Sequence, residues 1–455
     1  MSKGQKNGVD LVKGQPAKGI FLFAVPLILA NLFFQLYETV DTIIVGRFNG
    51  DAALAAVGAS FAVTMVMIAF ATGTGIGCSV LISKYYGSEN YAKVKTSVST
   101  VLIFSLIFSI VIGLLGILLS RTVLVFLGTP ENIMEEAALY LKIYSLGMPF
   151  MFLYNVQSSI FSSFGNSKMP LFLLILSSVL NILLDLLFVG LLHMGVMGAA
   201  VATVLAQSFS FVVSFVLLIK RVYFFEDWKS YEFHYFSFHI MKEMISYAFV
   251  SIIQSSITSI GLLLIQSVVN RYGSDVLAGY TAGNKIDSFA IVPFMAVGNA
   301  LSTYTAQNLG AGKRERIGKG FWAGIMLCAA MAVGIFFINI LFKNQLIGLY
   351  LDADTSSADA VDTGLMYISQ MAIFYFFMGL SSCQSGMLRG EGRLKILFVN
   401  CFISLMVRVG FAFTMVSCLG VSAVWLSLPA GWVISSIYMV IAQRVPFRKK
   451  PRIST

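Results

Sequence analysis

Charged side chains are scarce in this sequence of 455 residues. Asp, Glu, Lys and Arg make up only 11% of it, whereas 58% of the residues are hydrophobic, and a soluble domain usually carries about 25% charged residues. This composition excludes an ordinary water-soluble globular protein. A membrane β-barrel would show strands of alternating polarity about 10 residues long, and the uniformly apolar runs of this chain indicate helices instead.

Residues for enzymatic or metal chemistry are also rare. The chain has three histidines, and no zinc motif or nucleophile–histidine pair is visible. The five cysteines lie in apolar runs, without the spacing of metal ligands or of a disulfide framework. We therefore expect no enzyme activity, no cofactor and no metal other than a transported ion. The first 18 residues hold four lysines but no cleavable apolar core, so no signal peptide is expected.

Apolar runs that are long enough to cross a bilayer of roughly 30 Å recur along the whole chain. We predict twelve membrane helices with the approximate ranges 19–46, 54–83, 96–119, 135–164, 168–191, 196–219, 240–270, 276–306, 317–341, 363–388, 394–417 and 422–443.

The connecting segments carry very unequal numbers of Lys and Arg residues. With the N-terminus inside, 24 of these residues lie in inner segments and 4 in outer ones. The positive-inside rule then predicts that both termini are cytoplasmic. Basic loops beside anionic headgroups account for the net charge of +10, so no nucleic-acid partner is expected, and we expect a monomer.

An internal repeat bounds the architecture. An offset of 223 pairs Gly75 with Gly298, and an offset of 227 pairs Gln157 with Gln384. Each half holds six helices, so both halves enter the membrane in the same direction, related by an axis along the membrane normal. The expected fold is an all-α integral membrane protein with twelve transmembrane helices in two six-helix bundles.

The repeat also divides the chain into segments. The segment that joins the two halves is expected to be amphipathic and to lie on the inner membrane surface, and a plain linker is the alternative. The expected segments are a cytoplasmic N-terminal segment (1–18), an N-lobe with helices 1–6 (19–220), the linker (221–239), a C-lobe with helices 7–12 (240–444) and a basic cytoplasmic tail (445–455).

Polar side chains interrupt two apolar runs of the first half. Gln35, Glu38 and Asp41 lie in the first predicted helix, and Asn181 and Asp185 lie in the fifth. A carboxylate in hydrocarbon costs several kcal/mol unless it faces a cavity, a partner or an ion. These positions therefore mark either a functional site or a satisfied polar network that holds the helices together.

The predicted directions of the helices bring several of these residues to one depth. Asp41 and Asp185 lie near the outer ends of helices 1 and 5, and Thr203 lies near the outer start of helix 6. Oxygen ligands coordinate hard cations, and neighbouring carboxylates in a low dielectric hold a proton more tightly. With Asn181 and Glu38, the set is expected to bind and release Na⁺ or H⁺.

The second half lacks these acids but has its own charges within the membrane. By the repeat offsets, Asp185 corresponds to Ala412, so we expect ion chemistry in the N-lobe. Lys285, Asp287 and Arg408 form the expected charge network of the C-lobe, with Asp287 as a structural ion-pair partner of Arg408 or Lys285. A role in substrate binding is the alternative.

Four motifs together resemble those of the multidrug and toxic compound extrusion (MATE) transporters. Pro26 with the run 38–46 resembles their first helix, and 181–185 resembles their fifth-helix motif. The run 306–312 resembles the turn after their eighth helix, and 386–390 resembles the end of their tenth. The resemblance covers nearly the whole chain.

This resemblance implies a V-shaped, two-lobed antiporter that exports cationic or amphipathic compounds in exchange for Na⁺ or H⁺. It implies a hinge at Pro26, where some members bend helix 1. The implied cation ligands are Asp41, Asn181, Asp185 and Thr203, and the implied cavity-lining residues are Gln35, Tyr37 and Asn155.

Two departures from the family pattern bear on coupling. Many relatives have proline after the fifth-helix aspartate, where this chain has Leu186. Another branch carries acids on helices 7 and 10, where this chain has Gln254 and Met378, which favours coupling in the N-lobe. The alternative function is a flippase for lipid-linked oligosaccharides, which would need a strongly basic cavity. Lys285 and Arg408 keep that alternative open.

Overall fold

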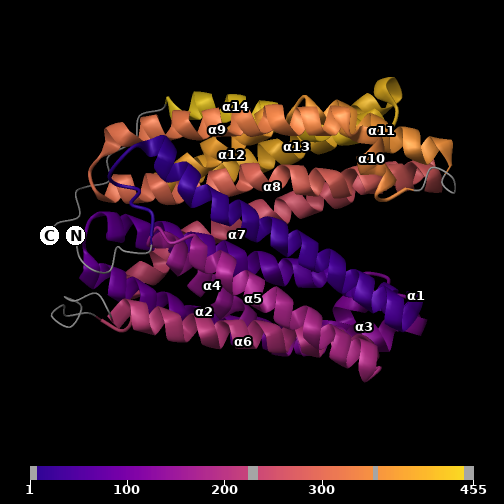
Figure 1. Ribbon diagram of the computed structural model, residues 1–455, viewed down its shortest axis with the longest axis horizontal. Coiled ribbons are helices and arrows are strands. Elements are labelled where there is room, and N and C mark those ends of the chain that lie inside the picture. The colour runs from indigo at the N-terminus through magenta and orange to yellow at the C-terminus, as the bar shows by residue number, and fades with distance from the viewer. Residues whose placement is uncertain (1–7, 224–233, 352–356, 445–455) are drawn as a thin grey trace. The chain divides into compact units, whose positions relative to one another are not determined.

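The computed structural model in Figure 1 describes residues 8–223, 234–351 and 357–444. The basic tail at 445–455, the first seven residues and most of the predicted linker (224–233) lie outside the described residues. In the described part of the chain the secondary structure is helical throughout, as the composition predicts.

The helices follow one another with short connections. Their bounds are α1 (Pro16–Gly87), α2 (Tyr91–Phe126), α3 (Glu131–Leu146), α4 (Met148–Ser163), α5 (Lys168–Asp185), η2 (Leu186–Leu191), α6 (Gly195–Tyr223), α7 (Phe238–Val269), η3 (Asn270–Tyr272), α8 (Ser274–Gly310), α9 (Arg314–Leu341), α10 (Lys343–Gly348), α11 (Ala358–Ala372), α12 (Tyr375–Gly390), α13 (Leu394–Leu419) and α14 (Ser422–Gln443).

The number of membrane spans agrees with the predicted twelve. Ten spans are long and apolar enough alone, two of them, Pro16–Asn49 and Ala55–Gly87, within α1. The pairs α3–α4 and α11–α12 bend by 50° and 53°, and each pair counts as one further span. Pro149 explains the first bend, since proline has no N–H for the helical ladder. The second bend lies at the matching place in the repeat, without a proline.

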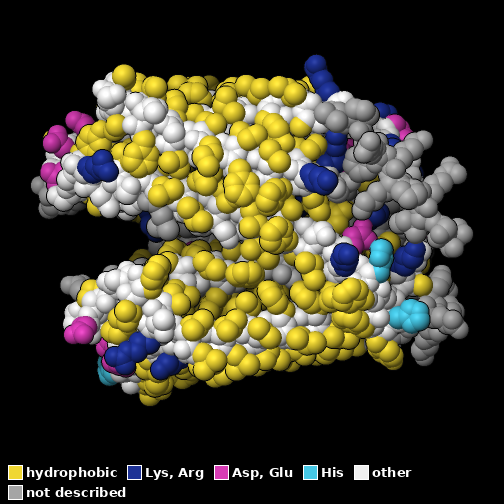
Figure 2. Space-filling model, turned by 180° about the vertical axis from the view of Figure 1, so that it is seen from behind, with side chains coloured by type: hydrophobic (Ala, Val, Ile, Leu, Met, Phe, Trp, Pro, Cys, Tyr) yellow, Lys and Arg dark blue, Asp and Glu magenta, His cyan; other side chains and the backbone are white. Residues whose placement is uncertain are grey.

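The outward surfaces of the helices suit a lipid environment. Figure 2 shows hydrophobic side chains along the flanks of the helices and charged side chains gathered near the helix ends. On α2, Leu118 is 75% exposed and Ile107 is 59% exposed. Such apolar exposure would be unfavourable in water and is what a bilayer-spanning helix requires.

The chain forms two compact units, which do not follow the sequence repeat. Unit 1 comprises Met1–Ser256, Asn299–Gly324 and Arg389–Gly392, and unit 2 comprises Ile257–Gly298, Ile325–Leu388 and Arg393–Thr455. Parts of α7, α8, α9 and α12 thus belong to unit 1. Close backbone approaches at glycines join these parts to α1, because a side chain at any of the glycines would collide with a neighbouring backbone. The tight pairs are Gly77 with Ala248, Gly87 with Gln307, and Gly310 with Lys84.

Candidate functional site

Three helices of unit 1 bring the predicted ion-binding residues together. Helix α5 packs against both α1 and α6, and Figure 1 shows α5 and α6 side by side. Asp41 lies on α1, Asn181 and Asp185 lie on α5, and Thr203 lies on α6. Asp185 and Asn181 are 0% and 2% exposed, and Asp41 is half-buried. The predicted residues therefore lie on three helices, of which α5 packs against the other two.

Hydrogen bonds orient Asn181 among these residues. In the amide orientation that suits its neighbours, Nδ2 donates to Oδ2 of Asp185 at 2.9 Å, and Oδ1 accepts from the backbone N–H of Thr203 at 3.2 Å. The opposite orientation gives only a 3.4 Å bond from Nδ2 to Oγ1 of Thr203. Asn181 therefore links α5 to α6 and supports one oxygen of the Asp185 carboxyl group.

The two carboxyl groups meet directly. The carboxyl groups of Asp41 and Asp185 lie close enough to share a hydrogen bond. Ionised carboxylates only accept, so this bond forms only when one of the two carries a proton. With both groups ionised, Oδ1 of Asp41 and Oδ1 of Asp185 are enclosed without a donor in the described part of the chain. A proton or a small cation would satisfy these oxygens.

The backbone changes its hydrogen-bonding pattern immediately after Asp185. Residues Leu186–Leu191 form the π-helical turn η2, and the N–H of Leu192 donates to the carbonyl of Leu187 at 2.9 Å. Segments of this kind are rare and occur frequently at functional sites. The aspartate therefore lies at the junction of two helix types.

Three tyrosines surround the acidic pair. Tyr37 and Tyr140 interact electrostatically with both Asp41 and Asp185, and Tyr144 stacks on Tyr140 with ring centroids 6.1 Å apart. Sequence reasoning named Tyr37 only. The available signal was the spacing of Tyr140 and Tyr144, which are four residues apart and so share one face of a helix.

The other predicted residues of the first half have local surroundings. Asn155 is half-buried and donates from Nδ2 to its own helix, to the carbonyl of Met151 at 2.9 Å. Gln35 is half-buried, and Glu38 interacts electrostatically with Tyr144. Pro26 is buried inside α1.

Asp287, a buried acid of unit 2, has different partners from those the sequence predicts. Asp287, which is 3% exposed, accepts from the hydroxyl of Tyr375 at 2.7 Å and from that of Tyr367 at 3.4 Å. Within the described residues no direct ion pair joins Asp287 to Arg408 or Lys285, which corrects the expected pairing. Arg408 contributes its charge at longer range, and Lys285 is exposed. Because tyrosine hydroxyls satisfy the carboxylate, it needs no direct ion pair.

Comparisons with known proteins agree on one family. The family model described as MatE matches residues 26–187 and 250–414. The probable multidrug resistance protein YoeA of Bacillus subtilis (strain 168) is 28% identical, over 99% of this chain and 98% of its own length. The probable multidrug resistance protein YpnP of the same organism is 28% identical, over 94% of each chain.

A solved structure shares the fold of this chain. It is described as the outward-facing conformation of a multidrug resistance MATE family transporter of the MOP superfamily. The two are 25% identical and superpose with a TM-score of 0.88, over 96% of this chain and 97% of that one.

Proposed function

This chain belongs to the MatE family of membrane transporters, and we propose that it exports cationic or amphipathic organic compounds in exchange for H⁺ or Na⁺. The observation that carries the proposal is the meeting of Asp41 and Asp185 inside unit 1, with an enclosed oxygen on each. The names of YoeA and YpnP support drug compounds as cargo.

The coupling ion binds where the acidic pair is incomplete. H⁺ would complete the hydrogen bond between the two carboxyl groups. Na⁺ would bind their oxygens with Oγ1 of Thr203, and the amide of Asn181 would turn over so that its oxygen, rather than its nitrogen, faces Asp185. These are the hard oxygen ligands that such cations prefer. Either ion removes net negative charge from a buried layer, where an uncompensated carboxylate is expensive.

Transport follows from binding that differs between two states. The ion enters from outside and favours the state that releases the organic compound. Its loss to the cytoplasm restores the negative charge, which then attracts the next organic cation. An ion can drive this cycle only to the extent that it binds the two states with different affinity.

We further propose that both termini are cytoplasmic, that the protein lies in a prokaryotic inner membrane, and that it acts as a monomer.

The acidic character of the layer supports cationic cargo over a lipid-linked saccharide. An exporter of pyrophosphate-linked sugars needs a strongly basic cavity. In this chain the intramembrane cation Arg408 lies within the electrostatic influence of Asp287, which reduces the local positive potential.

The test is export by purified protein in proteoliposomes, with the pH gradient and the Na⁺ gradient varied separately. For protein molecules whose cytoplasmic face points outward, we expect uptake of a cationic dye into the proteoliposomes to depend on one of the two gradients. Asp41→Asn should abolish that dependence at equal membrane levels. Dye movement that ignores both gradients, or that persists unchanged in Asp41→Asn, would exclude the proposed coupling.

A further inference from the structure

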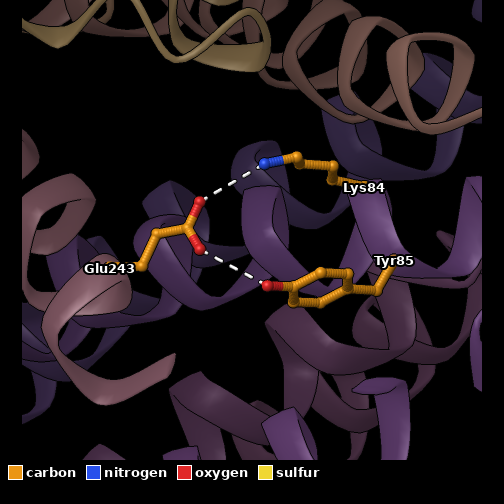
Figure 3. Close-up of polar contacts among 3 residues, drawn as sticks. All are labelled: Lys84, Tyr85 and Glu243. Carbon is orange, nitrogen blue, oxygen red and sulfur yellow. Dashed lines mark hydrogen bonds and ion pairs between the residues drawn. The ribbon is translucent and has the colours of Figure 1, made fainter. Parts of the chain in front are cut away.

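A polar clasp joins α1 to α7 in unit 1 (Figure 3). Nζ of Lys84 and the hydroxyl of Tyr85 both reach the carboxylate of Glu243, at 3.3 Å and 3.4 Å. The side chains of Lys84 and Glu243 are 30% and 26% exposed. The pair is thus accessible to water and salt, which makes it weak and easily released.

Tight backbone contacts lie directly beside the clasp. Gly87 meets the backbone of Gln307, and Gly310 meets that of Lys84. The side chain of Gln307 then donates to the carbonyl of Ser163 at 2.8 Å, and Ser83, which is 0% exposed, donates to the same carbonyl at 3.3 Å. The ends of α1, α4 and α8 therefore meet with little room for water.

The segment before α1 crosses the same place. We call residues 9–14 the strap. The N–H of Val9 donates to the carbonyl of Gly165 at 2.8 Å, which anchors the strap to the turn after α4. Nδ2 of Asn308 donates to the carbonyl of Leu11 at 2.9 Å, which anchors it to the end of α8. The side chain of Leu11 is only 1% exposed.

The turn between α8 and α9 holds the rest of the strap. Lys313 Nζ donates to the carbonyl of Val12 at 3.2 Å, and Arg316 Nη1 donates to that of Gly14 at 3.0 Å. Arg316 Nε also donates to Oδ1 of Asn308 at 2.9 Å, so the cation fixes the amide that binds Leu11. One short segment thus contacts elements that are about 150 and 300 residues away along the chain.

We propose that the clasp and the strap form the inner gate of the transporter, and that Lys84, Glu243 and the strap are positioning residues for the transport cycle. This inference rests on the proposed transport function. The tight glycine contacts exclude water while the gate is closed. The clasp is exposed and weak, and the strap adds single hydrogen bonds and one buried side chain, Leu11, so the gate can separate without the loss of an extended apolar core. A gate with this construction matches the few kcal/mol that separate transport states.

A single buried serine supplies the reporter. The five native cysteines are replaced by serine or alanine, and Ser83→Cys, a nearly isosteric change, introduces one thiol behind the gate. Inside-out vesicles are treated with a membrane-impermeant maleimide, and the labelling rate measures how often the gate is open. Monodisperse elution in detergent selects the variants that fold.

Charge reversal tests the clasp. We expect Lys84→Glu and Glu243→Lys each to raise the labelling rate about tenfold, because each leaves like charges facing one another. The double variant restores attraction and should return the rate to within about twofold of the parent. Lys93→Glu is the matched control, since Lys93 lies 5.9 Å from the Tyr85 ring centroid without an ion pair to Glu243 in the described part of the chain.

Removal of an anchor tests the strap. Asn308→Ala deletes the donor to Leu11, and we expect a labelling rate about fivefold higher. Equal labelling in the parent, both single charge variants and Asn308→Ala would overturn the gate, as would a double variant that labels as fast as the single ones. Labelling needs no cargo, so a chain that opens as described but moves no dye refutes the proposed function alone.

Discussion

Each unit contains a buried acidic site, and the two sites differ in whether hydrogen-bond donors satisfy the carboxylate oxygens. In unit 2, Asp287 receives two tyrosine hydroxyls, and Arg408 adds a positive charge nearby. In unit 1, Asp41 and Asp185 face each other, and an oxygen of each lacks a donor in the described part of the chain. The residue types are similar, and the difference lies in whether the donors match the acceptors.

On the proposed function, this difference predicts a structural role for Asp287 and a transport role for the pair in unit 1. A satisfied carboxylate gains nothing from an added ion, because the ion would have to displace a hydroxyl that already binds. An unsatisfied pair gains directly from a proton or a cation, and it returns to the costly state when the ion leaves. We therefore propose that the site of unit 1, rather than Asp287, couples ion binding to a change of state.

The largest expected effect follows from neutralising the incomplete site. Asp41→Asn should lower ion-driven dye export by about tenfold or more, because a site that binds the ion equally weakly in both states shifts no equilibrium. Export is measured in proteoliposomes at matched protein levels. Glu135→Gln is the control, since Glu135 is a surface acid whose side chain is 79% exposed. Full export by Asp41→Asn would contradict the transport role proposed for the acidic pair of unit 1.

Stability should respond in the opposite sense at the two sites. Asp287→Asn removes the charged acceptor of two tyrosines, so we expect a loss of about 1.5–3 kcal/mol in unfolding free energy. Asp41→Asn removes a charge that faces another carboxyl group, so its stability should stay level or rise by about 1 kcal/mol. Thermal unfolding in detergent measures both. A destabilised Asp41→Asn variant would mean that the acidic pair is a structural network.

A smaller effect is expected at the hydroxyl of the ion site. Thr203→Val keeps the shape but removes Oγ1, and we expect the ion concentration for half-maximal export to rise about fivefold with little change in stability. Thr42→Val is the matched control, because Thr42 donates to its own helix at Glu38 and is exposed. An unchanged ion dependence would remove Thr203 from the set of ligands.

The smallest expected effects compare the two tyrosines of unit 2. Tyr375→Phe should lower the unfolding free energy by about 1 kcal/mol, and Tyr367→Phe by less, since their hydroxyls lie 2.7 Å and 3.4 Å from the carboxylate. Thermal unfolding ranks the two variants. The reverse order would show that ring packing, and not hydrogen bonding, determines their contribution.

The sequence predicts the membrane helices well because composition alone determines them. A long apolar run can cross the bilayer only as a helix, and each predicted span has its counterpart in the structure. The approach of Asp41 to Asp185 and of Asn181 to Thr203 was also predictable, because helix direction and a fixed rise per residue place these residues at similar depths. The bends after Leu146 and Ala372 were less visible, and only Pro149 marks one of them.

Side-chain partners were the least predictable feature. Asp287 was expected to pair with a cation because opposite charges attract, yet rotamers and packing place two hydroxyls on it instead. The strap falls in the predicted cytoplasmic N-terminal segment (1–18), for which the sequence predicted no tertiary contacts. Its bonds to Gly165 and Asn308 depend on tertiary contacts that hydropathy does not encode.

The π-helical turn after Asp185 has a consequence for how this helix can move. A proline at the position of Leu186 would interrupt the helical hydrogen bonds permanently, because proline has no N–H to donate. Leucine keeps its donor, so the wider turn can tighten into an ordinary one and rotate the following segment by up to about 100°. If an ion bound at Asp185 favoured one of the two windings, its binding would rotate the segment that follows. Deleting one leucine from Leu186–Leu191 is expected to leave Asp185 in place and to hold the segment in the ordinary winding.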